Sequence, residues 1–464
     1  MTEVSPDQGS YRDFRGRIYH SRNRIFRTVM PEGAEDFEFV RSSGLVEELT
    51  GAGRLVDERL VEREVLGEAG ASAAYVLEHP RLPFVSWPYE WSFSGLKAAA
   101  LLHLDIHLAA LERGITMTDA SAYNVQFIGM RPVFIDRLSF CKYTDGEYWI
   151  GHRQFCEQFI NPLLLRSCLG VPHNAWYRGA LEGISTEALN DMLRWRHKLS
   201  WHVLTNVALQ ARLQRSSTAR GEAVRRARHK KLPLTALRQM LSGLRRWIAG
   251  LAPREAGNTT WESYPEENSY DRRETAAKRQ FITAFVGATR PGILWDIGCN
   301  TGDYASAALA AGADYVVGFD SDHGALERAA ARSAREELAF LPLYLDMANP
   351  SPDQGWGQSE RGGLLQRVPA DAVLALAVVH HLVIGKGIPL RSVLDSLLEM
   401  APQGVVEFVP LSDPMVQQML QLRDRHFGDY NPRAFENLLG CRARIVRSTA
   451  VSATGRTLYW YSRS

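Results

Sequence analysis

The sequence predicts two domains of different class, an α+β domain followed by an α/β domain with a mainly parallel sheet. Three observations support this division. The chain has 464 residues, more than one ordinary core accommodates. Residues 1–210 alternate short β-like runs with helical stretches, whereas from about residue 280 the order is β-α-β-α. Residues 211–262 are first basic and then loop-like, so we expect them to link the first domain to a second one at 263–464.

Composition narrows the functional class. The chain is 45% hydrophobic and 23% charged, as in globular proteins, and its net charge of +2 argues against nucleic acid as a partner. The N-terminal segment is polar, and the longest apolar run, at 372–379, is too short for a membrane span. Five scattered cysteines without a C-x-x-C pair favour a reducing compartment. We therefore expect a cytoplasmic protein.

The first domain opens with a predicted β-hairpin at 16–30, and the stretch 73–91 reads as a strand that leads into a hinge. Residues 96–114 (LKAAALLHLDIHLAALERG) predict a long amphipathic helix. Residues 125–136 (VQFIGMRPVFID) predict a tight hairpin with Gly129 in its turn.

An acidic motif surrounds this second hairpin. Asp119 is followed by Asn124 five residues later, and then by Asp136. In phosphoryl transfer, one such Asp orients the acceptor hydroxyl, while the Asn and the second Asp hold Mg²⁺. With the elements around it, the motif resembles the two-lobed kinases of the aminoglycoside-kinase type. That resemblance implies a kinase-like domain with catalytic Asp119, metal ligands Asn124 and Asp136, and ATP and Mg²⁺ as cofactors.

Two departures from the kinase pattern leave alternatives open. The opening hairpin lacks G-x-G-x-x-G, and no lysine precedes Lys97. Arg27 stands where the phosphate-binding lysine is expected, and its planar fork is not equivalent to an ammonium group. The domain is either an active phosphotransferase or a degenerate module. A third alternative is an unrelated α+β domain in which Asp119 and Asn124 stabilise a turn.

The basic region contains RRARHKK at 225–231, followed by apolar residues at helical spacing. These apolar residues, Leu237, Leu241, Leu244 and Ile248, predict an amphipathic helix. A binding surface for nucleic acid, or for a protein partner that docks through 212–250, is one interpretation, and a solvated helix face beside an acidic domain is the other.

The clearest motif is ILWDIGCNTGDYASAAL, which predicts a strand, a glycine turn and the start of a helix. Its spacing is D-x-G-x-x-x-G rather than the G-x-G-x-x-G of dinucleotide folds. Further strands are predicted to end at Asp320 and Asp346, and a fourth to run into His380 and His381. A fifth strand, GVVEFVP, and a final hairpin complete the series.

This order of elements resembles the class I S-adenosylmethionine-dependent methyltransferases, which have a Rossmann-like seven-stranded sheet. The resemblance implies that S-adenosylmethionine is the cofactor and assigns roles around it. Asp296 and Gly298 approach the methionine part, together with Asn300 and Gly302 of the same loop. Asp320 takes the ribose hydroxyls, and Asp346 and Met347 flank the adenine.

Other residues are candidates for the acceptor side. His380 or His381 can act as general base for an oxygen or nitrogen nucleophile, or the pair shapes the pocket. Glu407 on the fifth strand is expected to be structural, and the alternative is a place in the acceptor pocket. Tyr264 and Tyr270 precede the first strand and are candidates for closing over the cofactor or receiving the acceptor, and the alternative is a helix that packs on the sheet edge.

The whole chain also resembles the family of NoeA-like host-specific nodulation proteins, through stretches such as SWPYEWSFSGLKAAALLHL and WDIGCNTGDY. The resemblance implies a small-molecule or glycan-type methyl acceptor. Two alternatives are a bifunctional kinase-methyltransferase and a non-catalytic interaction scaffold.

Overall fold

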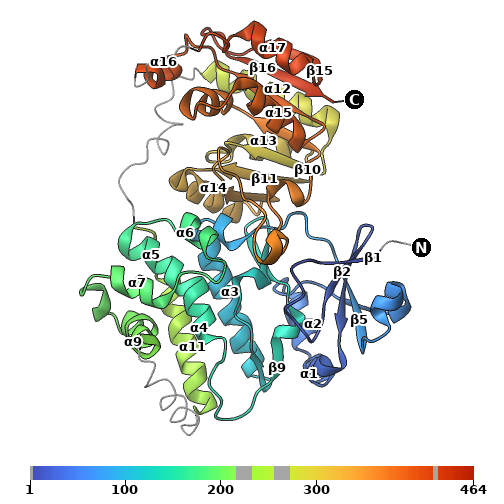
Figure 1. The fold of residues 1–464 in the computed structure, drawn as a ribbon, viewed down its shortest axis with the longest axis vertical. Helices are drawn as coiled ribbons and strands as arrows, with labels where there is room; N and C mark the ends of the chain where they lie inside the picture. The colour runs from blue at the N-terminus through green and yellow to red at the C-terminus, as the bar shows by residue number, and fades with distance from the viewer. Residues whose placement is uncertain (1–3, 216–231, 255–271, 422–426, 464) are drawn as a thin grey trace.

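The computed structural model describes residues 4–215, 232–254, 272–421 and 427–463. Figure 1 shows two domains along the longest axis, with the C-terminal domain above the N-terminal domain. Tyr264, Tyr270 and the basic run 225–231 lie outside the described residues. None of the helices in the described part of the chain has both the length and the apolar character that crossing a bilayer requires.

The N-terminal domain begins with a five-stranded antiparallel sheet in the order β1-β2-β3-β5-β4. The predicted opening hairpin corresponds to β2 and β3. The strands are β1 (Val4–Pro6), β2 (Ile18–Ser21), β3 (Arg24–Val29), β4 (Arg59–Val61) and β5 (Tyr75–His79), and α1 (Pro31–Ser42) and α2 (Leu45–Gly51) follow β3.

The rest of this domain is built around α3 (Phe93–Leu111), whose first turn is capped by the Ser92 hydroxyl, which accepts from Gly95 N at 3.1 Å. The helix was predicted to be amphipathic, but it buries residues on nearly every face, because it lies between neighbouring elements of both domains. Around it lie the ladders β6–β9 and β7–β8 and a set of short helices. Their bounds are β6 (Ile115–Met117), β7 (Val125–Ile128), β8 (Arg131–Phe134), β9 (Phe140–Lys142), α4 (His152–Phe155), α5 (Asn161–Leu169), α6 (Asn174–Gly179), α7 (Thr186–Met192), α8 (Trp201–Val203) and α9 (Leu209–Arg215).

The predicted amphipathic helix of the basic region is α11 (Leu234–Ala249). All four apolar residues on which its prediction rests are buried, and the helix contacts α3. Two of its arginines meet acids of α3 and its C-terminal end: Arg245 pairs with Asp105, and Arg238 with Glu112 at 2.8 Å. The apolar face of α11 is therefore covered within the chain itself.

The C-terminal domain is a seven-stranded sheet in the order β12-β11-β10-β13-β14-β16-β15, in which β16 runs antiparallel to both of its neighbours and the other six strands share one direction. Its strands are β10 (Ile293–Ile297), β11 (Tyr315–Asp320), β12 (Phe340–Tyr344), β13 (Ala372–Ala375), β14 (Gln403–Phe408), β15 (Arg444–Ala450) and β16 (Thr457–Ser462). Its helices are α12 (Arg272–Thr289), α13 (Asp303–Ala310), α14 (His323–Arg335), α15 (Leu390–Met400), α16 (Pro414–Gln421) and α17 (Pro432–Gly440). The predicted α/β class and the final antiparallel hairpin are confirmed.

Two strands end earlier than predicted. β12 ends at Tyr344, two residues before Asp346, and β13 ends at Ala375, well before His380. After β13 the chain turns at Ala377, which has φ +52°. His381 then opens a short π-helical turn, η10 (His381–Gly385). The two histidines therefore belong to the turn after the strand rather than to the strand.

Gly298 is one of two glycines with positive φ, with Gly302, on which the β10–α13 turn depends. It has φ +75°, and a Cβ at this position would lie 2.6 Å from Val378 Cγ2. We expect Gly298→Ala to cost about 1–3 kcal/mol of unfolding free energy, since both the backbone and the contact are strained. Urea denaturation measures this cost. The control is Gly287→Ala in α12, where a Cβ meets nothing within 4 Å and we expect no loss. Equal stability of the two variants would contradict the prediction.

The N-terminal domain contacts the C-terminal sheet in two places. Residues on one face of β10 and β11 contact it, and so does the edge strand β12. Phe84 packs edge-on against Trp295 and Phe319, with ring centroids 6.0 and 6.1 Å apart. At the β7–β8 turn, Gly129 N donates to the Tyr315 hydroxyl at 2.9 Å, and a Cβ on Gly129 would lie 2.4 Å from Leu338 O. The turn therefore docks directly on the C-terminal domain.

A long connection between β12 and β13, residues 345–371, makes the other main contact and is here named the bridging segment. Arg367 of this segment forms a bidentate ion pair with Glu90 at 2.6 and 2.7 Å, and both side chains are buried. Gly362 O accepts from Trp87 Nε1 at 3.0 Å. The bridging segment begins beside the predicted adenine site and ends at β13, so it connects the donor edge of the sheet with the N-terminal domain.

Candidate active site

The glycine turn after β10 and the end of β11 form one hydrogen-bonded unit. Gly298 N donates to Phe319 O at 2.8 Å, and Asn300 N donates to Asp320 Oδ2 at 2.8 Å. Asn300 itself has φ +47°, a conformation that asparagine tolerates better than most residues. Because β10 and β11 are parallel neighbours, their carboxyl ends place Asp296 and Asp320 at the same edge of the sheet.

Asp296 lies at this edge as a buried carboxyl whose Oδ2 has no hydrogen-bond partner among the described residues. Burial raises the pKa of Asp296 to about 7, and the nearby charges of Asp320 and Asp303 add to the effect. A buried acid that the protein leaves unsatisfied is typical of a site that a ligand completes.

Asp320 and Asp346 follow the next two strands. Asp320 accepts Asp322 N at 2.9 Å through Oδ1, and burial raises its pKa. Asp346 accepts Ala348 N at 2.9 Å and lies 3.6 Å from Lys386 Nζ. Met347, half-buried, packs against the core beside it. The structure thus brings together at one edge the residues predicted to hold the donor.

The two histidines differ in their surroundings. His380 is fully buried, and neither of its ring nitrogens has a partner among the described residues. His381 is half-buried, with its ring centroid 4.1 Å from that of His380. Burial lowers the pKa of His381 to about 4, with a contribution from Arg456, so its imidazole is neutral at neutral pH. Of the two, His381 has the exposure that proton exchange with a substrate requires.

A buried charge cluster next to these histidines was not predicted. Lys278 Nζ contacts both carboxylate oxygens of Glu407, at 2.7 and 2.8 Å, and Ala377 N donates to Glu407 Oε2 at 3.0 Å. Arg456 forms a bidentate pair with Asp413 at 2.6 and 2.8 Å. Glu407 therefore fixes the turn that leads from β13 to the histidines, in agreement with the structural role expected for it. The sequence did not indicate this role of Lys278, because it is one of several charged residues in α12 and nothing in the local pattern distinguishes it.

Comparison with known proteins identifies the family. A methyltransferase-domain family model matches residues 295–406. The Nodulation protein NoeA of Rhizobium meliloti (strain 1021) is 44% identical over 457 residues, which cover 98% of this chain and 96% of that protein. This chain belongs to the NoeA family. The C-terminal domain of this family member is an S-adenosylmethionine-dependent methyltransferase domain, as the sequence predicted.

Two solved methyltransferase structures each match just under half of this NoeA-family chain. Magnesium protoporphyrin IX methyltransferase from Synechocystis, with bound S-adenosylhomocysteine, is 18% identical and covers 48% of this chain and 95% of its own, with a TM-score of 0.31. The N-methyltransferase NodS from Bradyrhizobium japonicum WM9, in complex with the same product, is 14% identical and covers 44% and 99%, with a TM-score of 0.33.

The residues at the carboxyl edge fit the methyl donor chemically. The unsatisfied Asp296 carboxyl suits an ammonium group, and a carboxylate such as Asp320 matches two vicinal hydroxyls. Met347 offers an apolar surface beside the polar Asp346, as an aromatic base with an amino group requires.

The raised pKa of Asp296 predicts a pH dependence of product binding. Only the ionised carboxyl attracts an ammonium group, so we expect the affinity for S-adenosylhomocysteine to fall as pH drops below about 7. Stability changes in the opposite sense. Because the folded-state pKa exceeds the unfolded value, the folded protein binds the extra proton, and stability falls as pH rises from about 4 to 7. Calorimetric titration with S-adenosylhomocysteine from pH 6 to 8 tests the effect on binding. If the affinity of the Asp296→Asn variant depended on pH as steeply as that of the wild type, the prediction would be contradicted.

The N-terminal motif is also assembled in space. Asn124 Nδ2 donates to Asp119 Oδ2 at 3.1 Å and to Asp136 Oδ2 at 3.4 Å. Asp136 is already saturated, however. Its Oδ1 accepts from Arg27 Nη1 and from Leu138 N, and its Oδ2 also accepts from Ser139 Oγ. Arg27 thus pairs with the acid instead of extending toward a phosphate.

This arrangement does not fit the predicted Mg²⁺ ligands Asn124 and Asp136. A hard cation needs oxygen lone pairs, and four donors occupy the positions that the Asp136 carboxylate offers. Arg27 already neutralises the charge of the Asp136 carboxylate. Burial raises the pKa of Asp136, but the charge of Arg27 and the hydrogen bonds from Arg27, Ser139 and Leu138 N lower it, and the net shift is downward. Within the described ranges, His, Cys, Asp and Glu side chains form no cluster of three or more that could hold a metal ion.

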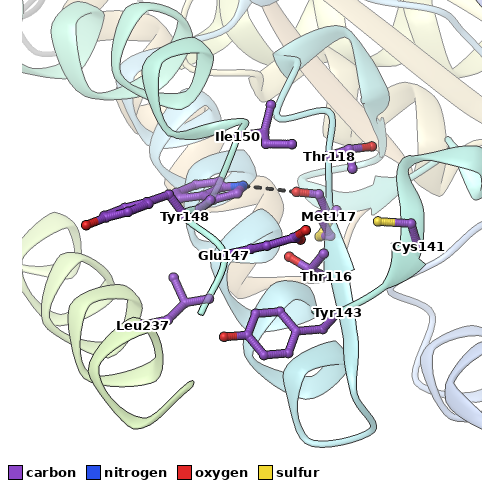
Figure 2. A pocket seen from close by; sticks show the side chains of 10 residues that line it. Thr116, Met117, Thr118, Cys141, Tyr143, Glu147, Tyr148, Ile150 and Leu237 are labelled. Atoms are coloured by element: carbon purple, nitrogen blue, oxygen red, sulfur yellow. Dashed lines mark hydrogen bonds between the residues drawn. The ribbon is translucent and has the colours of Figure 1, made fainter. Parts of the chain in front are cut away.

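A small pocket of this domain lies between the Thr116–Thr118 stretch, which leads into Asp119, and α11 (Figure 2). Trp149 Nε1 donates to Met117 O at 3.0 Å across it, and Leu237 of α11 closes one side. Its volume of about 60 Å³ is far below that of a substrate site. It is therefore a packing gap and not a second active site.

Proposed function

We propose that this protein transfers a methyl group from S-adenosylmethionine to a small or carbohydrate-linked acceptor at the carboxyl edge of the C-terminal sheet. The observation that carries the proposal is the convergence of the 298–302 turn, Asp296, Asp320 and the Asp346–Met347 pair at this edge. Membership of the NoeA family supports the class of acceptor.

Each residue has a separate task in this proposal. Asp320 holds the ribose hydroxyls, Asp346 and Met347 flank the adenine, and Asp296 receives the ammonium group. When bound, the sulfonium group supplies a methyl carbon that is already strongly electrophilic. The chain then needs to align a nucleophile and remove its proton, and in this proposal the proton acceptor is His381, whose imidazole is neutral at neutral pH. Glu407 and Lys278 keep the turn that carries His381 in place.

We also propose that the N-terminal domain has a kinase-like architecture. The five-stranded antiparallel sheet, the β7–β8 hairpin and the meeting of Asp119, Asn124 and Asp136 support this likeness. Phosphoryl transfer is not part of the proposal, because the saturated Asp136 does not fit Mg²⁺. The five cysteines are all free, which supports a reducing compartment such as the cytoplasm.

The test uses the full-length protein, methyl-labelled S-adenosylmethionine and fractionated cell extract, with products identified by untargeted mass spectrometry. We expect label in small or glycan-bearing molecules, with its transfer lost in Asp320→Ala and kept in Asp314→Ala at the opposite end of β11. Label found only in protein or nucleic acid would overturn the acceptor class. Absence of any enzyme-dependent label would overturn the function.

A further inference from the structure

A large cleft in the N-terminal domain takes part of its wall from the methyltransferase domain. It has a volume of about 830 Å³ and is lined by the β2–β3 hairpin, the end of β5 and the Asp119 loop. Glu360, Arg361 and Val368 of the bridging segment complete its wall. This volume is in the range of small-molecule sites.

The contacts of the bridging segment hold this wall firmly. Glu360, only 5% exposed, pairs with Arg12 at 2.9 Å and accepts from Trp356 N at 3.1 Å. The Arg361 guanidinium lies over the Tyr123 ring, 4.4 Å from its centroid. The cleft is therefore a composite of both domains rather than a site of the N-terminal domain alone.

The charges of the cleft do not suit a nucleotide triphosphate. Five arginines line it, but so do six carboxylates, which leaves no excess of positive charge. Arg12 and Arg27 are already paired with acids, Glu360 and Asp136. A ligand with several phosphates would face the Asp119 carboxylate, and the neighbouring Asp136, which already accepts from four donors, has no lone pair left to hold a shielding cation.

Several buried polar atoms in the wall require hydrogen-bond donors. His79 Nδ1 donates to Asp57 O at 3.0 Å, so Nε2 is an acceptor, and it has no partner among the described residues. Burial lowers the pKa of His79 to about 4, which keeps the ring neutral. The Asp119 carboxylate adds acceptor positions, and the buried Tyr123 hydroxyl is also unpartnered in the described structure. Hydroxyl groups satisfy such acceptors, whereas phosphate oxygens do not.

We propose that this composite cleft is a metal-independent binding site for a neutral polyhydroxylated ligand, a saccharide, whose hydroxyls donate to His79 Nε2 and Asp119. The site is separate from the methyl-donor edge and does not depend on the methyl-transfer proposal. Saccharides expose vicinal hydroxyls at spacings that carboxylate and imidazole acceptors match.

The experiment presents the full-length protein, in EDTA and without methyl donor, to an array of defined neutral and acidic oligosaccharides, followed by calorimetry with the strongest binder. Neutral oligosaccharides are expected to bind without metal. Asp119→Asn and His79→Leu should each weaken binding at least about tenfold, since each removes an acceptor from the cleft. The matched control is Asp145→Asn, an exposed acid of the same domain outside the cleft, with unchanged affinity.

Circular dichroism and thermal unfolding verify that each variant is folded. Three results would overturn the proposal: no oligosaccharide binding on the array, binding that survives both cleft substitutions, or magnesium-dependent ATP binding that Asp136→Asn abolishes. None of these results bears on S-adenosylhomocysteine binding, so the methyl-transfer proposal is judged separately.

Discussion

Replacing Asp320 with alanine is expected to weaken S-adenosylhomocysteine binding by roughly 100-fold. The carboxylate would accept both ribose hydroxyls, and each hydrogen bond to a charged acceptor contributes about 1.5–3 kcal/mol. The loss of affinity is increased further because Asp320 Oδ2 also accepts a hydrogen bond from Asn300 N and so holds the glycine turn in place. Calorimetric titration of the full-length protein measures the loss.

The control for this variant is Asp314→Ala, which removes an exposed acid just before β11, at the end of the strand away from the site. We expect wild-type affinity there. An Asp320→Ala protein that remains folded and binds within about threefold of wild type would show that the ribose site lies elsewhere.

Breaking the Glu90–Arg367 pair is expected to cost about 3–5 kcal/mol of unfolding free energy. Each side chain is almost fully buried at the domain interface, and removing one leaves the other as an uncompensated buried charge. Glu90→Leu and Arg367→Met should both show this loss in chemical denaturation. The double variant should recover much of it, because no buried charge remains.

The exposed pair Glu38–Arg41 provides the comparison, since its removal by Glu38→Ala should cost less than about 1 kcal/mol. If the buried single variants lost no more than this exposed one, the domain interface would be less tightly joined than the structure indicates. A double variant as unstable as the singles would instead assign the loss to packing.

Local patterns of the sequence predicted the parts of the fold that depend on neighbouring residues. The strand–turn–helix around Gly298, the β7–β8 hairpin around Gly129 and the apolar stripe of α11 all follow from spacing within about fifteen residues. The donor edge was predictable for the same reason, since parallel strands place the residues after their carboxyl ends together.

Features that join distant parts of the chain gave no such signal. The sequence puts Arg27 at the position of the phosphate-binding lysine of kinases. Its pairing with Asp136, 109 positions further along the chain, depends on the tertiary structure and could not be predicted from local spacing. The Glu90–Arg367 pair and the Lys278–Glu407 pair likewise join residues more than a hundred positions apart. The all-round burial of α3 also depends on neighbours from both domains, and periodicity alone shows only one buried face.

The most direct test is a crystal structure of the full-length protein with S-adenosylhomocysteine. Density for the product is expected at the carboxyl ends of β10, β11 and β12, with both ribose hydroxyls within hydrogen-bond distance of Asp320 and the adenine between Asp346 and Met347. Product bound in the N-terminal cleft, or an empty carboxyl edge at saturating concentration, would contradict the account.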